Sequence, residues 1–367
     1  MKWKFYSLAF VAGMSILTAC SSDDNNDNDG NGGNGNGNEI ENGTILKGTI
    51  TSDVTLAAGN TYKLSGEYIV EEGATLHIEE GVKIIAVYDD IADYILVKQG
   101  GKINAVGTPD KPIVMTSEKE EPGAWGGIHI CGRAHTNAEG GKGSSEIGGA
   151  VYGGNDDADN SGTLQYIRLE YTGFAFDEEH EANGISFYGV GNGTIVDHCQ
   201  AYKGSDDGFE FFGGSVNVSN LVAVSCSDDS FDWTEGWNGK GTNLVAYQEA
   251  ESTLGYDCDC LMECDNNGSN NAATPVAHPV LKNLILVGNG GSKQGIRLRA
   301  GTEVEIDNAK VCGKGQPLTV ETALTENALK NGTSKLTNIT LTSELSSKEG
   351  IYTHADFIAV TSNKVAA

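Results

Sequence analysis

The sequence predicts an all-β fold, a parallel β-helix solenoid with long loop insertions and a C-terminal cap. One segment occurs twice, because Ser205-Asp-Asp-Gly-Phe-Glu-Phe-Phe-Gly213 returns as Ser227-Asp-Asp-Ser-Phe-Asp-Trp-Thr-Glu235, 22 positions later. A period of this length, built from short strand-like runs that Gly and Asp interrupt, is typical of a solenoid. Helical repeats need about 33 residues or more, and the leucine-rich repeat skeleton is absent. A parallel β-helix, whose coils each give short strands to several sheets, fits the period.

The second observation is an alternating strand pattern that recurs along the chain, for example in Gly127-Ile-His-Ile-Cys-Gly132 and Gly295-Ile-Arg-Leu-Arg-Ala300. Period-2 alternation divides each strand into two faces. We expect the apolar set to form one continuous core column: Ile128, Ile130, Ile185, Phe187, Phe209, Phe211, Phe231, Trp233, Ile296 and Leu298. We expect the intervening side chains to face outward: His129, Ser186, Tyr188, Glu210, Phe212, Asp232, Thr234, Arg297 and Arg299.

The third observation is an Asn that precedes a hydrophobic triplet in successive coils. Stacked Asn amides can bond to each other from coil to coil. The predicted ladder consists of Asn220, Asn243, Asn283, Asn308 and Asn338.

The leader predicts export. Lys2 and Lys4 precede an apolar run that is too short to span a membrane permanently, so 1–19 is expected to be a signal peptide. Leu17-Thr-Ala-Cys20 resembles a bacterial lipobox, which implies that Cys20 becomes the lipidated N-terminus; an ordinary signal peptide with a chance Cys is the alternative. The acidic Ser21–Asp27 run resembles the export signal of Bacteroidota lipoproteins. It implies an outer-membrane, lipid-anchored protein that faces the outside of the cell.

Composition divides the rest of the chain and excludes some partners. Residues 20–43 are acidic and rich in Gly and Asn, which predicts a flexible tether, and 44–367 form the predicted β-helix domain. Without the leader the chain has 22 basic and 51 acidic side chains, a net charge of −29. Such a surface argues against nucleic acid and against anionic lipid as ligands. We expect a monomer that contacts the membrane only through its anchor.

Three excursions interrupt the predicted coils, at Arg133–Gly162, Phe174–Glu181 and Tyr256–His278. Loops of this length without structure of their own tend to be functional or mobile. The last segment contains a possible short helix near Glu321–Lys330 and two strand runs, around Ile339 and Phe357. We expect this segment to cap the open end of the solenoid.

Several motifs together resemble a known family. They are Trp125-Gly-Gly-Ile, Tyr152-Gly-Gly, Asp159-Asn-Ser-Gly-Thr-Leu and the two Ser-Asp-Asp segments described above. The chain resembles Gly-rich, right-handed parallel β-helix surface lipoproteins of Bacteroidota, with a pectin-lyase-like fold. The resemblance covers roughly residues 50–310. It implies the fold and the location and carries no reaction with it.

The repeated acidic residues have three interpretations. Asp206, Asp207, Asp228 and Asp229 lie one coil apart, and neighbouring strands are about 4.8 Å apart. Like charges this close raise each other's pKa unless a cation or backbone amides relieve them. The carboxylates could cap backbone amides at a repeated corner. Alternatively, they could bind Ca²⁺ through hard oxygen ligands, or serve as an acid/base pair for glycosidic cleavage.

The catalytic interpretation has candidate residues in Asp207, Glu210, Asp232 and Arg297. Pectin-degrading hydrolases of this fold combine paired Asp with Gly-His-Gly and Arg-x-Lys, and this chain has no Gly-His-Gly. Lyases of the fold use Ca²⁺ with a Lys or Arg base, the part that Arg297 or Arg299 would take. Surface arginines are more often simple counter-charges. Enzymatic activity is therefore left open, with binding favoured.

Aromatic residues suggest a ligand surface. Tyr188, Phe212 and Trp237 could form a platform for sugar rings together with Glu210 and Asp232, or the excursions could cover them.

The cysteines beyond Cys20 are seven, so at least one cannot join an intrachain disulfide. Cys258-x-Cys260-x₃-Cys264 could bind Zn²⁺, although disulfides are expected more often in an exported protein. The sequence leaves the pairing open among Cys131, Cys199, Cys226, Cys258, Cys260, Cys264 and Cys312.

The prediction for function is a surface lipoprotein whose β-helix binds an extracellular glycan, with Ca²⁺ as a possible cofactor. The alternatives are a polysaccharide lyase or glycoside hydrolase of the pectin-lyase-like fold, and a structural or adhesive surface protein.

Overall fold

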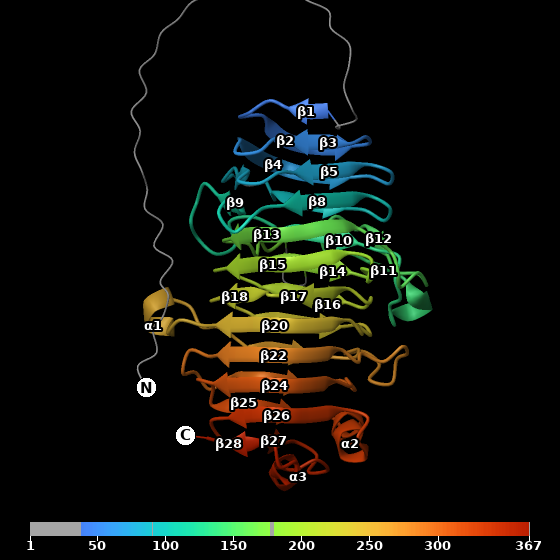
Figure 1. Cartoon of the computed structure of the whole chain (residues 1–367), viewed down its shortest axis with the longest axis vertical. Helices are drawn as coiled ribbons and strands as arrows, with labels where there is room; N and C mark the ends of the chain where they lie inside the picture. The colour runs from blue at the N-terminus through green and yellow to red at the C-terminus, as the bar shows by residue number, and fades with distance from the viewer. Residues whose placement is uncertain (1–37, 90, 177–179, 367) are drawn as a thin grey trace, which may run out of the picture. The chain divides into compact units, whose positions relative to one another are not determined.

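The computed structural model describes residues 38–89, 91–176 and 180–366, and these belong to a unit that extends from Asn36 to Ala367 (Figure 1). The predicted signal peptide, Cys20 and the acidic Ser21–Asp27 run lie outside the described residues. Among the described residues, no helix is long and apolar enough to cross a membrane.

Parallel pairing between successive coils dominates the fold, as predicted. In the described residues, one sheet contains 26 strands, and the coils follow one another along it in chain order (Figure 1). The first coils consist of β1 (Asn38–Ile40), β2 (Ile45–Ile50), β3 (Val54–Leu56), β4 (Thr61–Val70), β5 (Thr75–Ile78), β6 (Lys83–Ala86), β8 (Lys102–Val106) and β9 (Ile113–Ser117). The all-β parallel β-helix is therefore confirmed.

One face of the coils is a stack of short strands that we call the site ladder. Each strand pairs in parallel with the next. Its members are β7 (Tyr94–Val97), β10 (Ile128–Cys131), β14 (Ile185–Tyr188), β16 (Phe209–Phe212), β19 (Phe231–Thr234), β21 (Met262–Cys264), β23 (Gln294–Leu298), β25 (Gln316–Val320) and β27 (Ser346–Ser347).

The other faces are made mostly by longer, bent strands that continue from coil to coil. They are β13 (Gly162–Glu170), β15 (Ile195–Tyr202), β17 (Asn217–Ser219), β18 (Val222–Val224), β20 (Lys240–Tyr247), β22 (Val280–Val287), β24 (Glu305–Cys312), β26 (Lys335–Leu341) and β28 (Lys364–Val365).

The predicted core column is confirmed, since all ten of its side chains are buried in one cluster. Aromatic rings stack along it from coil to coil. The ring centroids of Phe187 and Phe211 are 5.0 Å apart, and those of Phe209 and Phe231 are 5.6 Å apart. Stacked rings in register add packing energy to the burial of their apolar surface.

The Asn ladder is also confirmed over most of its length. The Asn243 amide donates to Asn220 at 2.9 Å, Asn283 donates to Asn243 at 3.0 Å, and Asn308 donates to Asn283 at 2.8 Å. Asn338 departs from the ladder and donates to Asp307 at 2.6 Å. All five have a positive φ, between 55° and 65°. The bend of the long strands requires this left-handed backbone, which Asn tolerates better than most residues.

Three boundaries differ from the prediction. β1 lies within the range assigned to the tether, because its residues pair with β3. Met262–Cys264, expected inside an excursion, forms β21 and takes a place in the site ladder between β19 and β23. Phe357, expected in a strand, lies in α3 (His354–Ala359), where Thr353 and Asp356 form a capping box.

The C-terminal helix is confirmed as α2 (Ala323–Asn331), and α1 (Glu251–Leu254) precedes the third excursion. The first excursion contains a short 3₁₀ helix (Glu139–Gly141) and an antiparallel pair formed by β11 (Gly143–Ser144) and β12 (Val151–Tyr152).

Candidate ligand-binding site

The outward positions of the site ladder bring distant polar residues into one line. The strand register places His129, Ser186, Glu210, Asp232, Glu263 and Arg297 one after another in successive coils. Glu210 and Asp232 are therefore neighbours, as the sequence predicts. Arg297 lies two strands from Asp232, and Glu263 occupies the strand between them.

Sequence reasoning missed Glu263 because it placed Tyr256–His278 in a loop. A signal was present, however. Asp206 and Glu210, Asp228 and Asp232, and Asp259 and Glu263 share one spacing of four residues. The register of the structure aligns the second member of each pair in consecutive strands, and the first member precedes the strand in each coil.

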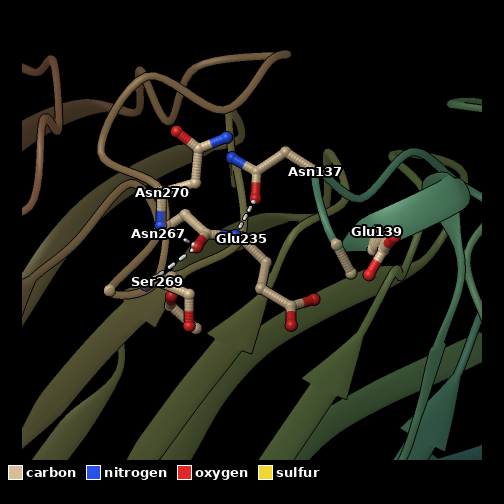
Figure 2. Close-up of a pocket in the computed structure, with 9 residues that line it drawn as sticks. Asn137, Glu139, Glu235, Asn267, Ser269 and Asn270 are labelled. Atoms are coloured by element: carbon tan, nitrogen blue, oxygen red, sulfur yellow. Dashed lines mark hydrogen bonds between the residues drawn. The ribbon is translucent and has the colours of Figure 1, made fainter.

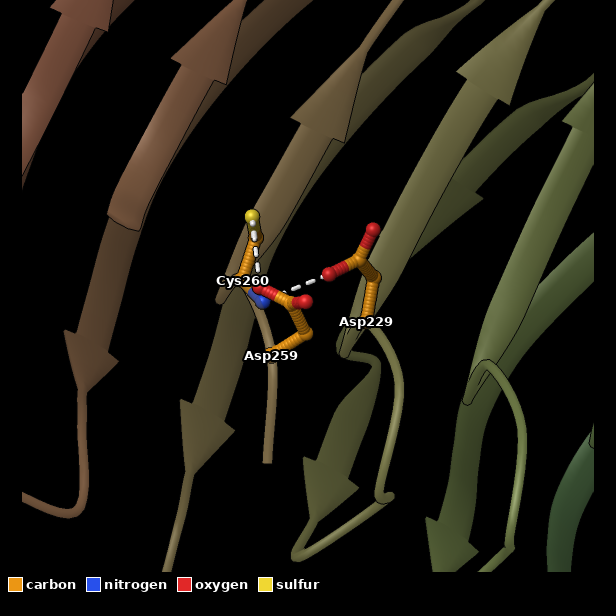
Figure 3. A group of neighbouring side chains, drawn as sticks. All are labelled: Asp229, Asp259 and Cys260. Atoms are coloured by element: carbon orange, nitrogen blue, oxygen red, sulfur yellow. Dashed lines mark hydrogen bonds between the residues drawn. The ribbon is translucent and has the colours of Figure 1, made fainter. Parts of the chain in front are cut away.

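A second line of acidic residues lies in the turns before these strands. The Asp207 carboxylate accepts a hydrogen bond from the backbone amide of Asp229 at 2.8 Å. The Asp229 carboxylate accepts one in turn from the backbone amide of Cys260 at 2.6 Å, beside Asp259 (Figure 3). Each of these two carboxylates thus uses one oxygen to cap the next coil, the role of the backbone-capping interpretation.

Together these residues form what we call the acid row: Asp206, Asp207, Glu210, Asp228, Asp229, Asp232, Asp259 and Glu263. Ligand atoms within 4.8 Å of one another occur in the overlapping groups Asp206–Asp207–Asp228, Asp207–Glu210–Asp232, Asp229–Asp232–Glu263 and Asp229–Asp259–Cys260.

One buried oxygen in the acid row has no hydrogen-bond partner in the described part of the chain. The Asp232 Oδ1 atom is buried and accepts no hydrogen bond from any described residue. Its neighbour Glu210 does have a donor, because the Asn183 amide binds the Glu210 carboxylate at 2.6 Å. A buried carboxylate oxygen without a donor is costly, so this position favours a proton or a cation.

The acid row cannot carry its full negative charge unaided. Burial and the charge of Asp228 raise the pKa of Asp206 to about 8, and burial raises the pKa of Asp228 to about 6. Burial, followed by neighbouring carboxylates, also raises the pKa of Asp207, Glu210 and Asp232 well above the usual range. Bound protons or a bound cation would therefore stabilise the folded row by offsetting its negative charge.

Two arginines neutralise carboxylates at one end of the site ladder. Arg297 Nη1 lies 2.8 Å from Glu263 Oε2, and Arg297 Nε lies 3.3 Å from Glu321 Oε1. Arg299 Nε lies 2.7 Å from Asp265 Oδ1. Burial lowers the pKa of Arg297, but hydrogen bonds and attraction to Glu321 and Glu263 outweigh it and raise the pKa above its usual value. Arg297 is thus a charge partner and is poorly suited to act as a base.

The aromatic platform expected from the sequence is not at the surface. Tyr188 is fully buried and Phe212 is 7% exposed, in a cluster that includes Ile147 and Tyr152 of the first excursion. Trp237 lies in the main core, with its ring 4.2 Å from that of Phe211. The excursion folds back over the outward aromatic rings, because their apolar surface is more stable when it is buried.

Burial of the cysteines argues against the Zn²⁺ site considered for Cys258, Cys260 and Cys264. All seven cysteines after Cys20 are free, and six of them are buried. Cys264 faces the core from β21, so it cannot share a metal ion with Cys258 and Cys260 outside the coil. Cys260 instead lies beside two members of the acid row, Asp229 and Asp259 (Figure 3).

A polar cleft of about 720 Å³ lies beside the acid row. In Figure 2, Asn137 and Glu139 of the first excursion lie on one side, and Asn267, Ser269 and Asn270 of the third excursion lie on the other. Thr234 and Glu235, at the end of β19, lie between them. Since Thr234 is two residues from Asp232 on the same strand, the cleft and the acid row share one outer surface.

Comparison with known proteins supports the fold. Residues 48–367 match the model of a family described as a pectate-lyase like β-helix domain. No curated protein matches the chain in sequence.

Two solved structures align with the chain at low similarity. The Dettilon tailspike protein (gp208) has 8% sequence identity and a TM-score of 0.32, and the alignment covers 81% of this chain and 56% of that one. The A-module of the Azotobacter vinelandii mannuronan C-5 epimerase AlgE6 has 11% identity and a TM-score of 0.26, with 80% and 83% covered. The chain thus spans about half the length of the tailspike protein, and neither alignment carries an argument about function.

The raised pKa values predict an unusual pH dependence of stability. The folded acid row keeps protons that the unfolded chain, with carboxyl pKa values of about 4, has already lost. The free energy of unfolding should therefore fall as the pH rises from about 4 through about 6 for Asp228 and about 8 for Asp206. Thermal denaturation in buffer with EDTA should give a lower Tm at about pH 8 than at about pH 5.

The Asp232→Asn variant should flatten this dependence, because it removes one charge from the centre of the row. Glu344→Gln removes a charge from an exposed residue outside the row and is the matched control. A wild-type Tm that is constant over this range, or that rises with pH, would contradict the prediction.

Proposed function

Because the chain belongs to the pectate-lyase-like β-helix family, we propose that it is a surface-anchored protein that binds an extracellular glycan. The binding surface is the outer face of the site ladder at β16, β19 and β21. Ca²⁺ is held in the acid row and takes part in binding. The rest of the molecule provides a rigid scaffold for this surface.

The observation that carries the proposal is the acid row itself. Carboxylate oxygens from consecutive coils converge within 4.8 Å in overlapping groups of three, and no described residue donates a hydrogen bond to Asp232 Oδ1. Ca²⁺ prefers hard oxygen ligands, and its charge offsets the repulsion between carboxylates that, after burial, raises the pKa of these carboxyl groups. The sequence predicts four ligands for the ion: Asp206, Asp207, Asp228 and Asp229. We propose Glu210, Asp232 and Glu263 as further ligands.

A glycan fits this site for geometric and chemical reasons. Ca²⁺ takes about 6–8 oxygen ligands, so an ion in the row has positions left for hydroxyl oxygens of a ligand. The parallel coils supply outward polar side chains at a regular spacing of about 4.8 Å, which suits an extended chain molecule. The adjoining polar cleft provides amides and carboxylates that can bind hydroxyl groups.

We propose binding without turnover. His129 lies in the same line of residues but is fully buried, and burial lowers its pKa to about 4. Arg297 is engaged by Glu263 and Glu321. Neither His129 nor Arg297 is therefore available as a base, and we propose that the carboxylates of the row hold Ca²⁺ and do not take a proton from a substrate.

The second candidate is a glycoside hydrolase or polysaccharide lyase. Glu210 and Asp232 favour the hydrolase, since their oxygens lie within 4.8 Å and both have raised pKa values. A carboxyl pair about 5–5.5 Å apart is the arrangement of retaining glycosidases.

The membrane attachment rests on the lipobox-like Leu17-Thr-Ala-Cys20 segment. Expression of Cys20→Ala should abolish incorporation of labelled palmitate, whereas the wild type should be labelled. Equal labelling of both proteins would contradict the anchor. Protease treatment of intact cells should degrade the wild-type protein if it faces outward.

Removal of Ca²⁺ should destabilise the wild type. A ligand that binds only the native state stabilises it by about 2.7 kcal/mol at a concentration a hundredfold above its Kd. Adding Ca²⁺ to chelated protein should raise the Tm by several degrees at neutral pH. Asp232→Asn, or Asp228→Asn together with Asp229→Asn, should remove most of this response, while Glu344→Gln should retain it. A wild-type Tm that does not respond to Ca²⁺ would favour backbone capping alone.

Turnover is tested with polymers that enzymes of this fold cleave. Incubation with pectin, alginate and glycosaminoglycans should release neither unsaturated products nor reducing ends above the level of a Glu210→Gln variant. The isosteric change keeps the shape of the side chain and removes its acid function. An excess of product with the wild type would replace binding by the second candidate.

A further inference from the structure

The polar cleft has a chemistry of its own that the acid row does not share. It is lined by Asn137, Ala138, Glu139, Thr234, Glu235, Asn267, Gly268, Ser269 and Asn270. A volume of about 720 Å³ is within the range of small-ligand sites, about 300–1,000 Å³. The cleft is thus large enough to hold part of an oligosaccharide.

The two walls of the cleft are joined by an amide clasp. Asn137 is 8% exposed, and its Nδ2 atom donates to Asn266 Oδ1 at 2.8 Å and to the Pro275 carbonyl at 3.0 Å. Asn267 Nδ2 donates back to Asn137 Oδ1 at 2.9 Å (Figure 2). The first and third excursions are therefore held in place before a ligand arrives, which lowers the entropy lost on binding.

The floor of the cleft is also fixed. Glu235 has a φ of 53°. Its Oε2 atom accepts hydrogen bonds from Thr136 Oγ1 at 2.7 Å and from the Tyr152 hydroxyl at 2.8 Å. Both donors belong to the first excursion, and they fix the position of the carboxylate at the base of the cleft. On the rim, Glu139 is exposed.

The lining selects against negative charge. Asn amides and Ser and Thr hydroxyls both donate and accept hydrogen bonds, and the two Glu carboxylates accept them, so hydroxyl groups can be bound in either sense. None of the nine lining residues is basic (Figure 2). A uronate or sulfate group would face Glu139 and Glu235 without a counter-charge, and such like-charge contacts suppress binding.

We propose that the polar cleft is a specificity site that binds uncharged sugar units of the glycan and rejects uronate and sulfated units. This inference rests on the proposed glycan-binding function. It adds the ligand class, since the acid row with Ca²⁺ does not by itself distinguish neutral from acidic chains.

The test compares neutral and acidic oligosaccharides of one length on the full mature chain loaded with Ca²⁺. Calorimetry would use cellohexaose, xylohexaose, mannohexaose and maltohexaose against hexagalacturonate and hexamannuronate. At least one neutral hexaose should bind about tenfold or more tightly than either uronate, the equivalent of about 1.4 kcal/mol. Glu139→Lys should reduce this ratio or reverse it, and Glu139→Gln should change it in the same direction by a smaller factor.

Glu344→Lys is the matched control, because it makes the same charge change at an exposed residue that does not line the cleft. It should leave the ratio unchanged. Each variant's Tm and its response to Ca²⁺ should match the wild type, since Glu139 lies outside the acid row.

Two outcomes overturn the inference. Uronates that bind wild-type protein as tightly as every neutral hexaose would overturn the specificity while leaving glycan binding intact. A ratio that shifts equally in Glu139→Lys and Glu344→Lys would assign selectivity to the overall charge. Failure of every hexaose to bind, by contrast, would overturn the proposed glycan function together with the inference.

Discussion

The in-register pairing of parallel strands from coil to coil is the constraint on which the rest of the structure depends. Ile185 pairs with Phe209, and Phe209 pairs with Phe231, so an apolar residue is repeated at the same inward position along the core. The backbone hydrogen bonds of this pairing also fix the outward positions, where Glu210 pairs with Asp232 and Asp232 pairs with Glu263. A favourable apolar stack and an unfavourable carboxylate stack are thus two consequences of a single register.

The fold handles this repetition differently on its different faces. At the bend of the long strands the repeated residue is Asn, whose amide both donates and accepts, so Asn220, Asn243 and Asn283 stabilise one another. Carboxylates lack a donor when ionised, and stacking them raises their pKa. Such a row is expensive to keep in a folded protein unless a proton or cation occupies it, and polar arrangements of this kind are often retained for function.

The neutralising groups are unevenly distributed along the site ladder. Arg297 and Arg299 pair with Glu263, Asp265 and Glu321 at one end. At the other end, Glu210 accepts a hydrogen bond from the Asn183 amide, and Asp232 Oδ1 accepts none from the described residues. The uncompensated charge is therefore centred on β16 and β19, next to the cleft that the first and third excursions enclose. In the proposed complex, the acid row and the polar cleft would contact neighbouring parts of one ligand.

The sequence by itself determined the β-helix, the core column and the Asn ladder, because each follows from local alternation and from a repeat of about one coil. It also placed Glu210 beside Asp232, since equal spacing in adjacent coils fixes their register. The position of Glu263 depended on β21, which is only three residues long and is flanked on both sides by excursion residues, so alternation alone did not reveal it.

Burial was decided only by the tertiary structure. Tyr188 and Phe212 do alternate outward from the coil, yet the first excursion returns over them and removes them from solvent. Likewise, the cleft exists because Asn137 meets Asn266 and Asn267 from a segment about 130 residues away in the chain. Sequence periodicity specifies which way a strand residue points, whereas contacts between distant loops depend on side-chain complementarity that no local pattern records.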